Sequence, residues 1–384
     1  MRICYLYGGV HATDGGIGFL RILCSQLRSW GHTCFTILGE AHEVLMGEAV
    51  DQEIHLNGDW SLGFGAAQRQ TQNQLRSALH ELKPDVVHII HPSAYYGANG
   101  NIHALPVIWR EYPVVATFWG FNMGHGATWL TRALVLWLLW GSQALASHDF
   151  KLMADMRRLC LGMRQMHFLP VGSNILPSAA VLQASRPELR QRYNLDLDKQ
   201  YIGYFGGFDQ SMGVVDLCQA VRRLREDGHH RLRLLLIGWQ RHRQNPRFLA
   251  MQQSIEREHI EDIVIMTPYA PDEEAAGLLR AADLVALPYR HNSLGRSSLM
   301  AALRAGAPVV LASSLDDLGC LNEAVVRVPP QNPTTLAQQI DSVLKDPQRA
   351  EVLGQSGRQV WEKNFSWPVI AKNHLEVYQT ILKQ

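Results

Sequence analysis

Glycine residues at two points of the chain have the spacing of anion-binding turns. Gly15 and Gly16 follow a short apolar run and precede a helical pattern, and Gly206 and Gly207 do the same later in the chain. Glycines between a strand and a helix let backbone N–H groups approach an anion, and the helix dipole adds to the attraction. A tight turn without a ligand explains such glycines equally well.

A third candidate is a polar loop that leads into an apolar helix. Its polar and glycine residues, with the arginine just before them, are Arg290, Asn292, Ser293, Gly295, Arg296, Ser297 and Ser298. Serines at a helix start suit an N-cap, which leaves the first N–H groups pointing out of the helix. Each arginine adds a planar, positively charged guanidinium with several N–H donors. The loop therefore indicates an anion site more strongly than a capped helix alone would.

Strands and helices alternate along both halves of the chain, which predicts two parallel sheets covered by helices. Strands are expected at residues 3–7, 33–38, 85–90, 114–118, 144–147, 201–205, 231–237, 263–266, 284–287 and at 309–310. A turn is expected at 15–18 and helices at 19–30, 68–82, 128–140, from 213 to 225, and at 272–282, 299–304 and 369–382. Ligands of open parallel sheets bind beyond the carboxyl ends of the strands. We therefore expect the three glycine and arginine loops to line one cleft between the two halves.

Length and composition predict a two-domain protein with reduced cysteines. The chain has 384 residues, more than one hydrophobic core usually organises. We expect a first domain at 1–175 completed by a crossover helix at 367–384, a linker at 176–198 and a second domain at 199–366. The six cysteines lack metal-like spacing, and the net charge of +1 does not indicate nucleic acid as a partner. We expect a cytoplasmic protein.

The most apolar segment, residues 133–140, is far shorter than the roughly 20 residues that span a bilayer. A buried core helix is the first interpretation. The alternative is a surface helix that inserts Trp129, Trp137 and Trp140 into a membrane interface, which would make the protein membrane-peripheral.

Seven segments, taken in order, resemble the retaining nucleotide-sugar glycosyltransferases of family 4. They are residues 83–90, 113–120, 168–175, 204–221, 282–310, 328–340 and 364–382. The resemblance implies the α/β fold called GT-B, with two Rossmann-like doubly wound domains and a C-terminal helix that crosses back to the first domain. It further implies a nucleoside diphosphate-sugar donor on the second domain and a sugar or lipid-linked acceptor on the first. It implies no cofactor and no obligatory metal.

The chain departs from that family at its polar positions. The two glutamates of the family fall on Asn292 or Ser293 and on Ala301, and no Asp or Glu stands between residues 288 and 308. The Arg and Lys that face the diphosphate in the family fall on Gly207 and Met212.

The family histidine falls on Trp119, so we expect His125, between two glycines, to replace it as a catalytic group. Some branches of the family have an Arg-Ser loop, which implies that Arg296 with Ser297 and Ser298 takes over the diphosphate as the second catalytic group.

The remaining site predictions follow from the same resemblance. Gly15, Gly16, Gly206, Gly207, Tyr269, Arg290, Asn292, Ser293, Gly295, Ser297 and Ser298 are predicted to bind the donor, with Tyr269 near the base. His91, Tyr95 and Trp119 are predicted on the acceptor side, where aromatic faces stack on sugar rings or pack the cleft wall. We expect a glycosyltransferase. The alternative is a non-catalytic relative that binds a glycan, a nucleotide or a partner transferase, and an epimerase or phosphorylase is a third, weaker candidate.

Overall fold

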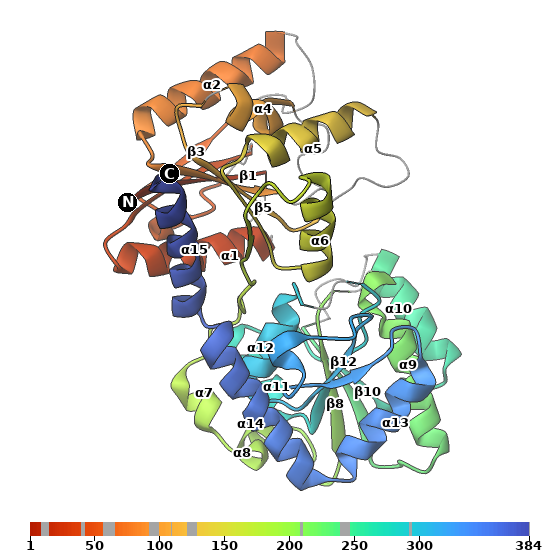
Figure 1. Ribbon diagram of the computed structural model, residues 1–384. Helices are drawn as coiled ribbons and strands as arrows, with labels where there is room; N and C mark the ends of the chain where they lie inside the picture. Colours follow the sequence, from red (N-terminus) through yellow and green to blue (C-terminus); the bar gives the residue numbers. More distant parts are fainter. Residues whose placement is uncertain are drawn as a thin grey trace. The chain divides into compact units, whose positions relative to one another are not determined.

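The computed structural model describes residues 1–8, 15–39, 43–56, 66–91, 100–108, 110–120, 129–207, 210–238, 246–291 and 294–383. The chain divides into two compact units. The first comprises Met1–Gly172 and Trp367–Gln384, and the second comprises Ser173–Ser366. Each unit has its own parallel sheet, so each is described separately (Figure 1).

The first unit is built on a seven-stranded sheet in the order β3-β2-β1-β4-β5-β6-β7. The strands are β1 (Arg2–Tyr7), β2 (Thr33–Leu38), β3 (Gln52–His55), β4 (Val86–His91), β5 (Val114–Phe118), β6 (Ala144–Ser147) and β7 (Met166–Phe168). Every pair is parallel, and Tyr5 lies opposite Thr36 on one side and His88 on the other. Because the crossovers lie on the faces of the sheet, the central strands are buried on both sides.

Helices cover both faces of this first sheet (Figure 1). They are α1 (Gly15–Ser29), α2 (Ala66–Leu82), α4 (Gly100–Ile108), α5 (Trp129–Gly141), α6 (Phe150–Leu159) and α15 (Trp367–Leu382), with a short 3-10 turn η1 (Gly47–Ala49). Apolar residues of α1 and α15 form the core on one face, and those of α2, α4, α5 and α6 form the core on the other.

The second unit has a six-stranded parallel sheet in the order β10-β9-β8-β11-β12-β13. Its strands are β8 (Gln200–Phe205), β9 (Leu232–Ile237), β10 (Val264–Met266), β11 (Leu284–Leu287), β12 (Val309–Ala312) and β13 (Val326–Val328). Its helices are α7 (Ala179–Gln183), α8 (Arg186–Arg192), α9 (Val214–Glu226), α10 (Pro246–Arg257), α11 (Asp272–Ala281), α12 (Ser297–Ala305), α13 (Pro333–Leu344) and α14 (Pro347–Asn364), with 3-10 turns η2 (Gln210–Met212), η4 (Glu261–Ile263) and η5 (Gly319–Leu321).

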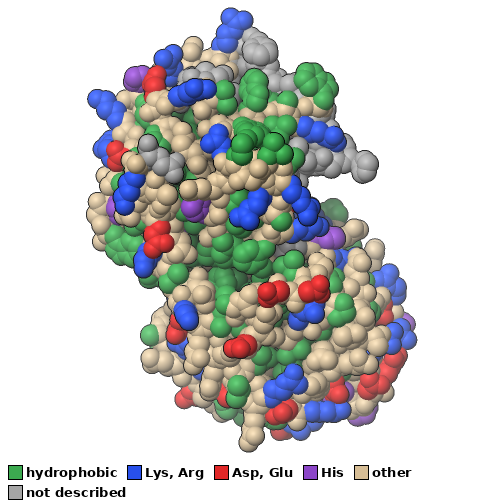
Figure 2. Space-filling view, viewed as in Figure 1, with side chains coloured by type: hydrophobic (Ala, Val, Ile, Leu, Met, Phe, Trp, Pro, Cys, Tyr) green, Lys and Arg blue, Asp and Glu red, His purple; other side chains and the backbone are tan. Residues whose placement is uncertain are grey.

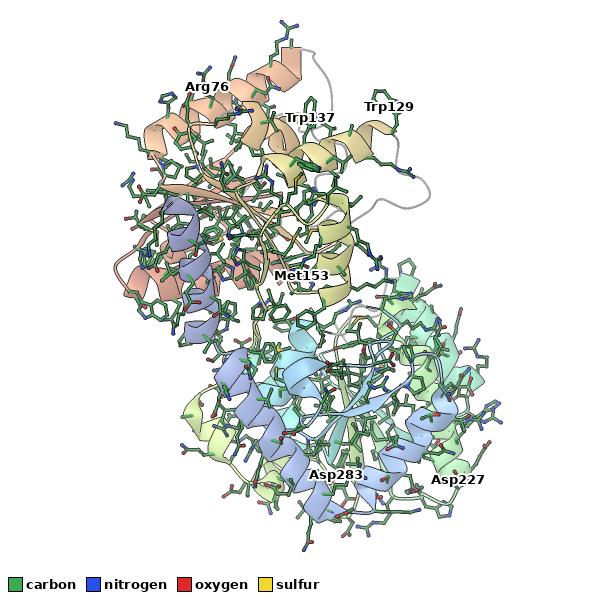
Figure 3. All side chains as sticks on the ribbon, viewed as in Figure 1. Arg76, Trp129, Trp137, Met153, Asp227 and Asp283 are labelled. Atoms are coloured by element: carbon green, nitrogen blue, oxygen red, sulfur yellow. The ribbon has the colours of Figure 1, made fainter. Side chains whose placement is uncertain are left out.

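The predicted linker contains structure of its own. Residues 176–198 include α7 and α8, which contact α11 and belong to the second unit. A capping box of Ser185 and Glu188 starts α8. Arg190 then donates to the Ala281 carbonyl at 3.0 Å and to the Asp283 carboxylate at 2.6 Å (Asp283 is labelled in Figure 3). These long-range contacts hold the segment on the sheet, although its sequence is polar and weakly patterned.

The C-terminal helix returns to the first unit, as expected for this fold class. The Tyr378 hydroxyl on α15 is hydrogen-bonded to the His88 Nδ1 at 2.6 Å and to the Tyr5 hydroxyl at 3.0 Å. The other ring nitrogen of His88 lies 2.7 Å from the Thr117 hydroxyl. The helix therefore completes the core of the first unit through apolar contacts and a buried polar network.

Candidate functional site

Four polar segments meet at the carboxyl edge of the second sheet. They are the glycine turn after β8, the turn η2 before α9, the residues that follow β11, and the start of α12. The backbone N–H of Arg290 donates to the Ser211 carbonyl at 2.8 Å, which joins the loop after β11 to η2. The parallel topology places these segments at one edge, since β8 and β11 are neighbours in the sheet.

Glycines let these segments approach one another closely. A Cβ on Gly206, whose φ is +153°, would lie 2.7 Å from the Met212 Cε and 3.5 Å from the Ser298 hydroxyl oxygen. A Cβ on Gly213, whose φ is +69°, would lie 1.8 Å from the Pro288 carbonyl oxygen. Glycine is therefore required at Gly213 by backbone conformation and by space, and at Gly206 by backbone conformation.

The start of α12 differs from the predicted serine N-cap. The N-cap residue is Arg296, and Ser297 and Ser298 are the first helical residues. The Ser298 hydroxyl pairs with the buried Tyr289 hydroxyl at 2.6 Å. The prediction of a serine cap was wrong because this tertiary partner engages the side chain of Ser298. The N–H groups of the first turn still point out of the helix, as at any helix start.

Arg290 is already bound to a carboxylate. Its Nε and Nη2 donate to the Asp216 Oδ2 and Oδ1 at 3.0 and 2.8 Å, a bidentate geometry. These hydrogen bonds raise the pKa of Arg290, which keeps the guanidinium charged. The prediction that both arginines of this loop are available to an anion was therefore wrong for Arg290, because Asp216 balances its charge within the fold.

Arg296 is held in a different way. Its Nη2 donates to the Ser211 hydroxyl at 3.0 Å, and its guanidinium carbon lies 5.5 Å from the centre of the Tyr289 ring. Burial raises the pKa of Tyr289, so this phenol stays neutral beside the guanidinium. A hydroxyl and an aromatic face orient Arg296 beside the start of α12.

The remaining residues of the second unit that were predicted to bind the donor are Gly207, Gly295, Tyr269, Asn292 and Ser293. Gly207 accepts a hydrogen bond at its carbonyl from the Tyr204 hydroxyl at 2.7 Å. Gly295 directly precedes Arg296, and Tyr269 is exposed in the loop after the edge strand β10, which lies two strands from β8. Asn292 and Ser293 lie outside the described residues.

The predicted glycine turn of the first unit is the first turn of a helix. Gly15 and Gly16 begin α1, so the predicted turn was wrong. A Cβ on Gly16 would lie 2.1 Å from the Tyr7 hydroxyl, whereas a Cβ on Gly15 would meet nothing within 4 Å. Gly16 permits the close approach of the helix to the end of β1, and Gly15 stands at the exposed helix start.

The acceptor-side residues differ in accessibility. His91 is 2% exposed, and its Nε2 lies 3.0 Å from the His103 Nε2. Burial and the neighbouring His103 lower the pKa of His91 to about 3, so it is a neutral core residue. Trp119 is half-buried against Phe19, with ring centres 5.3 Å apart. Tyr95 and His125 lie outside the described residues.

The sequence analysis missed the residues that organise these groups. Only contacts with predicted residues identify four further residues, which are Asp216, Ser211, Tyr204 and Tyr289. Asp216 alone carried a sequence signal, since it is an acidic residue in the first turn of a helix.

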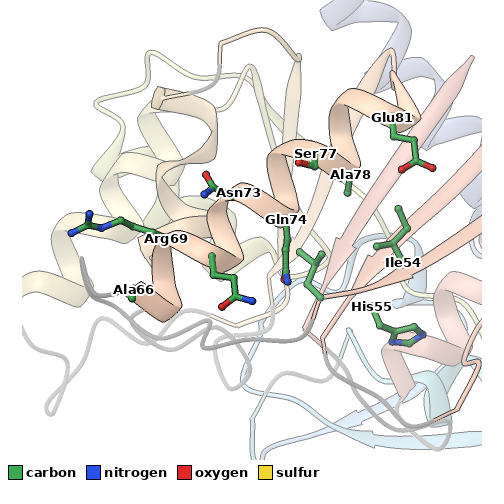
Figure 4. A pocket seen from close by; sticks show the side chains of 11 residues that line it. Ile54, His55, Ala66, Arg69, Asn73, Gln74, Ser77, Ala78 and Glu81 are labelled. Atoms are coloured by element: carbon green, nitrogen blue, oxygen red, sulfur yellow. The ribbon is translucent and has the colours of Figure 1, made fainter.

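A large cavity elsewhere contains no predicted residue. It has a volume of about 920 Å³ and lies in the first unit beside β3 and α2 (Figure 4). Amide side chains such as Gln70, Asn73 and Gln74 line it. Within the described ranges, no three His, Cys, Asp or Glu side chains gather as a metal site would require.

Similarity to known proteins extends over both units. Residues 185–360 match the model of a family described as Glycosyl transferases group 1. An uncharacterized glycosyltransferase of Methanocaldococcus jannaschii is 26% identical over 50% of this chain and 48% of its own length. A glycogen synthase of Mycobacterium tuberculosis is 24% identical over 83% of this chain and 75% of its own length. The match thus spans about half of the first relative and three quarters of the second.

Solved structures share the fold along the whole chain. A sucrose-phosphate synthase from Thermosynechococcus elongatus superposes with a TM-score of 0.78 at 16% identity and covers 100% of both chains. Anabaena HepE in complex with UDP gives a TM-score of 0.76 at 14% identity, over 99% of this chain and 100% of its own. The fold is GT-B, and the family match with the relatives supports a glycosyltransferase at the general level.

Proposed function

We propose that the chain transfers a sugar from a nucleoside diphosphate-sugar to an acceptor, with retention of configuration at the transferred carbon. The single observation that supports this most is the grouping of Gly206, Arg296 and the start of α12 at the carboxyl edge of the second sheet. Glycosyltransferases with this fold, such as HepE, have been solved with UDP and with UDP-glucose. We infer a family 4 relative with an altered donor site.

The proposed chemistry is stabilisation of the departing diphosphate. Arg296 and the outward N–H groups of Ser297 and Ser298 would face the two phosphates, where negative charge develops as the sugar leaves. Gly206 would let the backbone approach the same group. Arg290 would act indirectly, because its ion pair with Asp216 holds the loop in place. The base would lie beside the loop that contains Tyr269.

The acceptor side of the proposal rests on the first unit. Trp119, and Tyr95 in a loop outside the described residues, would contact a sugar or lipid-linked acceptor. His125 is proposed as the histidine that replaces the one missing from the family motif. The donor would be held without an obligatory metal or cofactor, in a cytoplasmic protein that contacts membranes peripherally.

A thermal unfolding series tests the donor. UDP at about 100 times its dissociation constant should add roughly 2.7 kcal/mol to the free energy of unfolding, and EDTA should not change this gain. GDP, ADP, dTDP and CMP serve as competing bases. Arg296→Ala should lose most of the gain, whereas Arg223→Ala, an exposed arginine on α9, should keep it. Unfolding unaffected by any nucleotide would contradict the proposed donor site.

One observation favours a second function. The absence of any carboxylate between residues 288 and 308 removes the groups with which the resembled family contacts sugar and ribose. A catalytically inactive relative would bind UDP and UDP-glucose but release no UDP from the sugar conjugate, with or without acceptors. Steady release of UDP from UDP-glucose, lost in Arg296→Ala and reduced in His125→Ala, would exclude this alternative.

A further inference from the structure

The outward face of α5 is apolar although it is exposed to solvent. Trp129 is 79% exposed and Trp137 is 50% exposed, while Trp140 is half-buried at the end of the same helix. These residues and Leu136 recur at helical spacing, so they share one face. Figure 3 shows Trp129 and Trp137 projecting from the first unit.

The opposite face of α5 packs into the core of the first unit. Leu134, Val135, Leu138 and Leu139 are buried in the first unit. The expectation of a core helix therefore holds for one face only. Large exposed tryptophans on the other face are not needed for folding, and contiguous exposed apolar surface of this kind marks an interaction site.

Basic residues accompany this apolar face. The segment from residue 129 to residue 168 contains five Lys or Arg residues and two Asp residues. Of the two aspartates, Asp149 caps α6 and Asp155 lies 3.6 Å from the Arg158 guanidinium. No acidic residue occurs in α5. Figure 2 shows hydrophobic and basic side chains together where Figure 1 places α5 and α6.

The helix α6 carries further basic and apolar side chains on the same unit. It lies on the same face of the sheet as α5, and Arg164, just after α6, donates to the Trp140 carbonyl. Lys151, Arg157 and Arg158 are exposed on α6. Exposed apolar residues stand among them, with Phe150 at the start of α6 and Leu161 after its end.

We propose that Trp129, Arg132, Trp137 and Trp140 of α5, with Lys151, Arg157 and Arg158 of α6, form a docking surface for an anionic lipid bilayer. Tryptophan prefers the membrane interface, where its ring meets the acyl boundary and its N–H stays hydrated. Each Lys or Arg near an anionic leaflet contributes further attraction. No helix in the described part of the chain is long and apolar enough to cross a bilayer. The proposed contact is with the membrane interface.

Charge favours a lipid surface over a second copy of the chain. A two-fold symmetric contact brings the same patch of two copies together. The arginines of one copy would then face those of the other, with Asp155 as the exposed carboxylate between them. An anionic leaflet complements both the positive charge and the tryptophans. The surface includes no residue of the donor site, so this inference deepens the peripheral membrane contact proposed above and does not depend on the donor chemistry.

Sedimentation of the full chain with vesicles tests the docking surface. The protein should bind vesicles of phosphatidylcholine with about 30% phosphatidylglycerol and bind pure phosphatidylcholine about tenfold more weakly, as expected for anionic attraction. Trp129→Gln with Trp137→Gln should lower binding by about tenfold or more. Trp30→Gln is the matched control, because Trp30 is 41% exposed on the opposite face of the sheet.

A charge variant separates the two contributions. Arg157→Gln with Arg158→Gln should weaken binding to anionic vesicles by at least about fivefold and leave neutral vesicles unchanged. Lys372→Gln on α15, combined with Lys383→Gln just after α15, should have no such effect. Unfolding curves and the UDP-induced gain in stability report on folding and on the donor site independently of vesicles.

Two results would overturn the inference. Folded protein that fails to bind anionic vesicles, or that binds equally well without Trp129 and Trp137, contradicts a lipid-docking surface. Concentration-dependent dimers that the tryptophan variant abolishes, without vesicle binding, would assign the surface to a second copy. Loss of the UDP effect with intact vesicle binding would instead concern the proposed function alone.

Discussion

At the scale of single residues, the two arginines of the loop between β11 and α12 have different surroundings. Arg290 forms a bidentate ion pair with Asp216, whereas Arg296 donates to a hydroxyl and lies over the Tyr289 ring. An ion pair inside a loop fixes backbone geometry, whereas a guanidinium beside the start of a helix adds its positive charge to that of the helix N-terminus. Their substitutions should therefore affect different properties.

Arg290→Gln should lower the free energy of unfolding by about 1–3 kcal/mol, because it leaves the largely buried Asp216 carboxylate without its partner. In a double-mutant cycle with Asp216→Asn, the double variant should lose less than the sum of the single losses. Urea unfolding of the four proteins measures this coupling energy. Additive losses would show that the pair contributes no net stability.

At the scale of elements, close packing at the strand ends depends on glycines inside helices as well as in turns. The first helical turn of α1 contains two glycines that sequence alone cannot tell apart. Gly16 faces the Tyr7 ring and Gly15 faces open space. Helical glycine costs stability relative to alanine unless a neighbour requires its lack of a side chain.

Gly16→Ala should therefore destabilise the protein by about 1–3 kcal/mol, since its Cβ would displace the buried Tyr7 ring that packs on Trp119. Gly15→Ala is the matched control and should be neutral or stabilising by up to about 1 kcal/mol. Thermal unfolding of the two variants compares them directly. Equal stability of both variants would contradict the observed packing of α1.

At the scale of the whole molecule, the last helix in the chain completes the unit that contains the first strand. The packing contact between this helix and the sheet includes two buried imidazoles, those of His374 on α15 and His88 on β4. Burial, reinforced by His374, lowers the pKa of His88 well below its usual range, and burial lowers the pKa of His374 to about 4. The phenols of Tyr5 and Tyr378 and the thiols of Cys24 and Cys34 are further titratable groups of this region.

These histidines should make the protein sensitive to mild acid. The unfolded chain takes up protons below about pH 6.5 while the folded unit does not, so stability is fully present above that pH and falls between about pH 6.5 and 4. Each histidine adds a slope approaching about 1.4 kcal/mol per pH unit. Urea unfolding at pH 7 and pH 5 should show a smaller pH effect in His374→Asn, whereas exposed His80→Asn should match the parent.

An unchanged difference between the two pH values in His374→Asn would show that this imidazole is not titrated on unfolding. The comparison does not depend on the absolute stability of the variant, because only the change with pH is evaluated.

The fold was predictable from the sequence wherever strands are central. The predicted bounds of β2, β5, β6 and β11 agree with the structure, because these strands are almost completely buried and consist mainly of apolar residues. The edge strands β3, β7 and β13 were missed, whereas the edge strand β10 was predicted. All four are short and only partly buried, so their sequence signal is weak.

The sequence by itself determined two α/β units, the crossover helix and the presence of glycine and arginine loops at strand ends. Only the tertiary structure decided that Arg290 pairs with Asp216, which serine is engaged and which tryptophans remain exposed. Arg290 and Asp216 are 74 positions apart, and their contact exists because two loops meet at one sheet edge. Periodicity along a chain specifies local elements and buried faces, whereas partners brought together by neighbouring strands leave no local pattern.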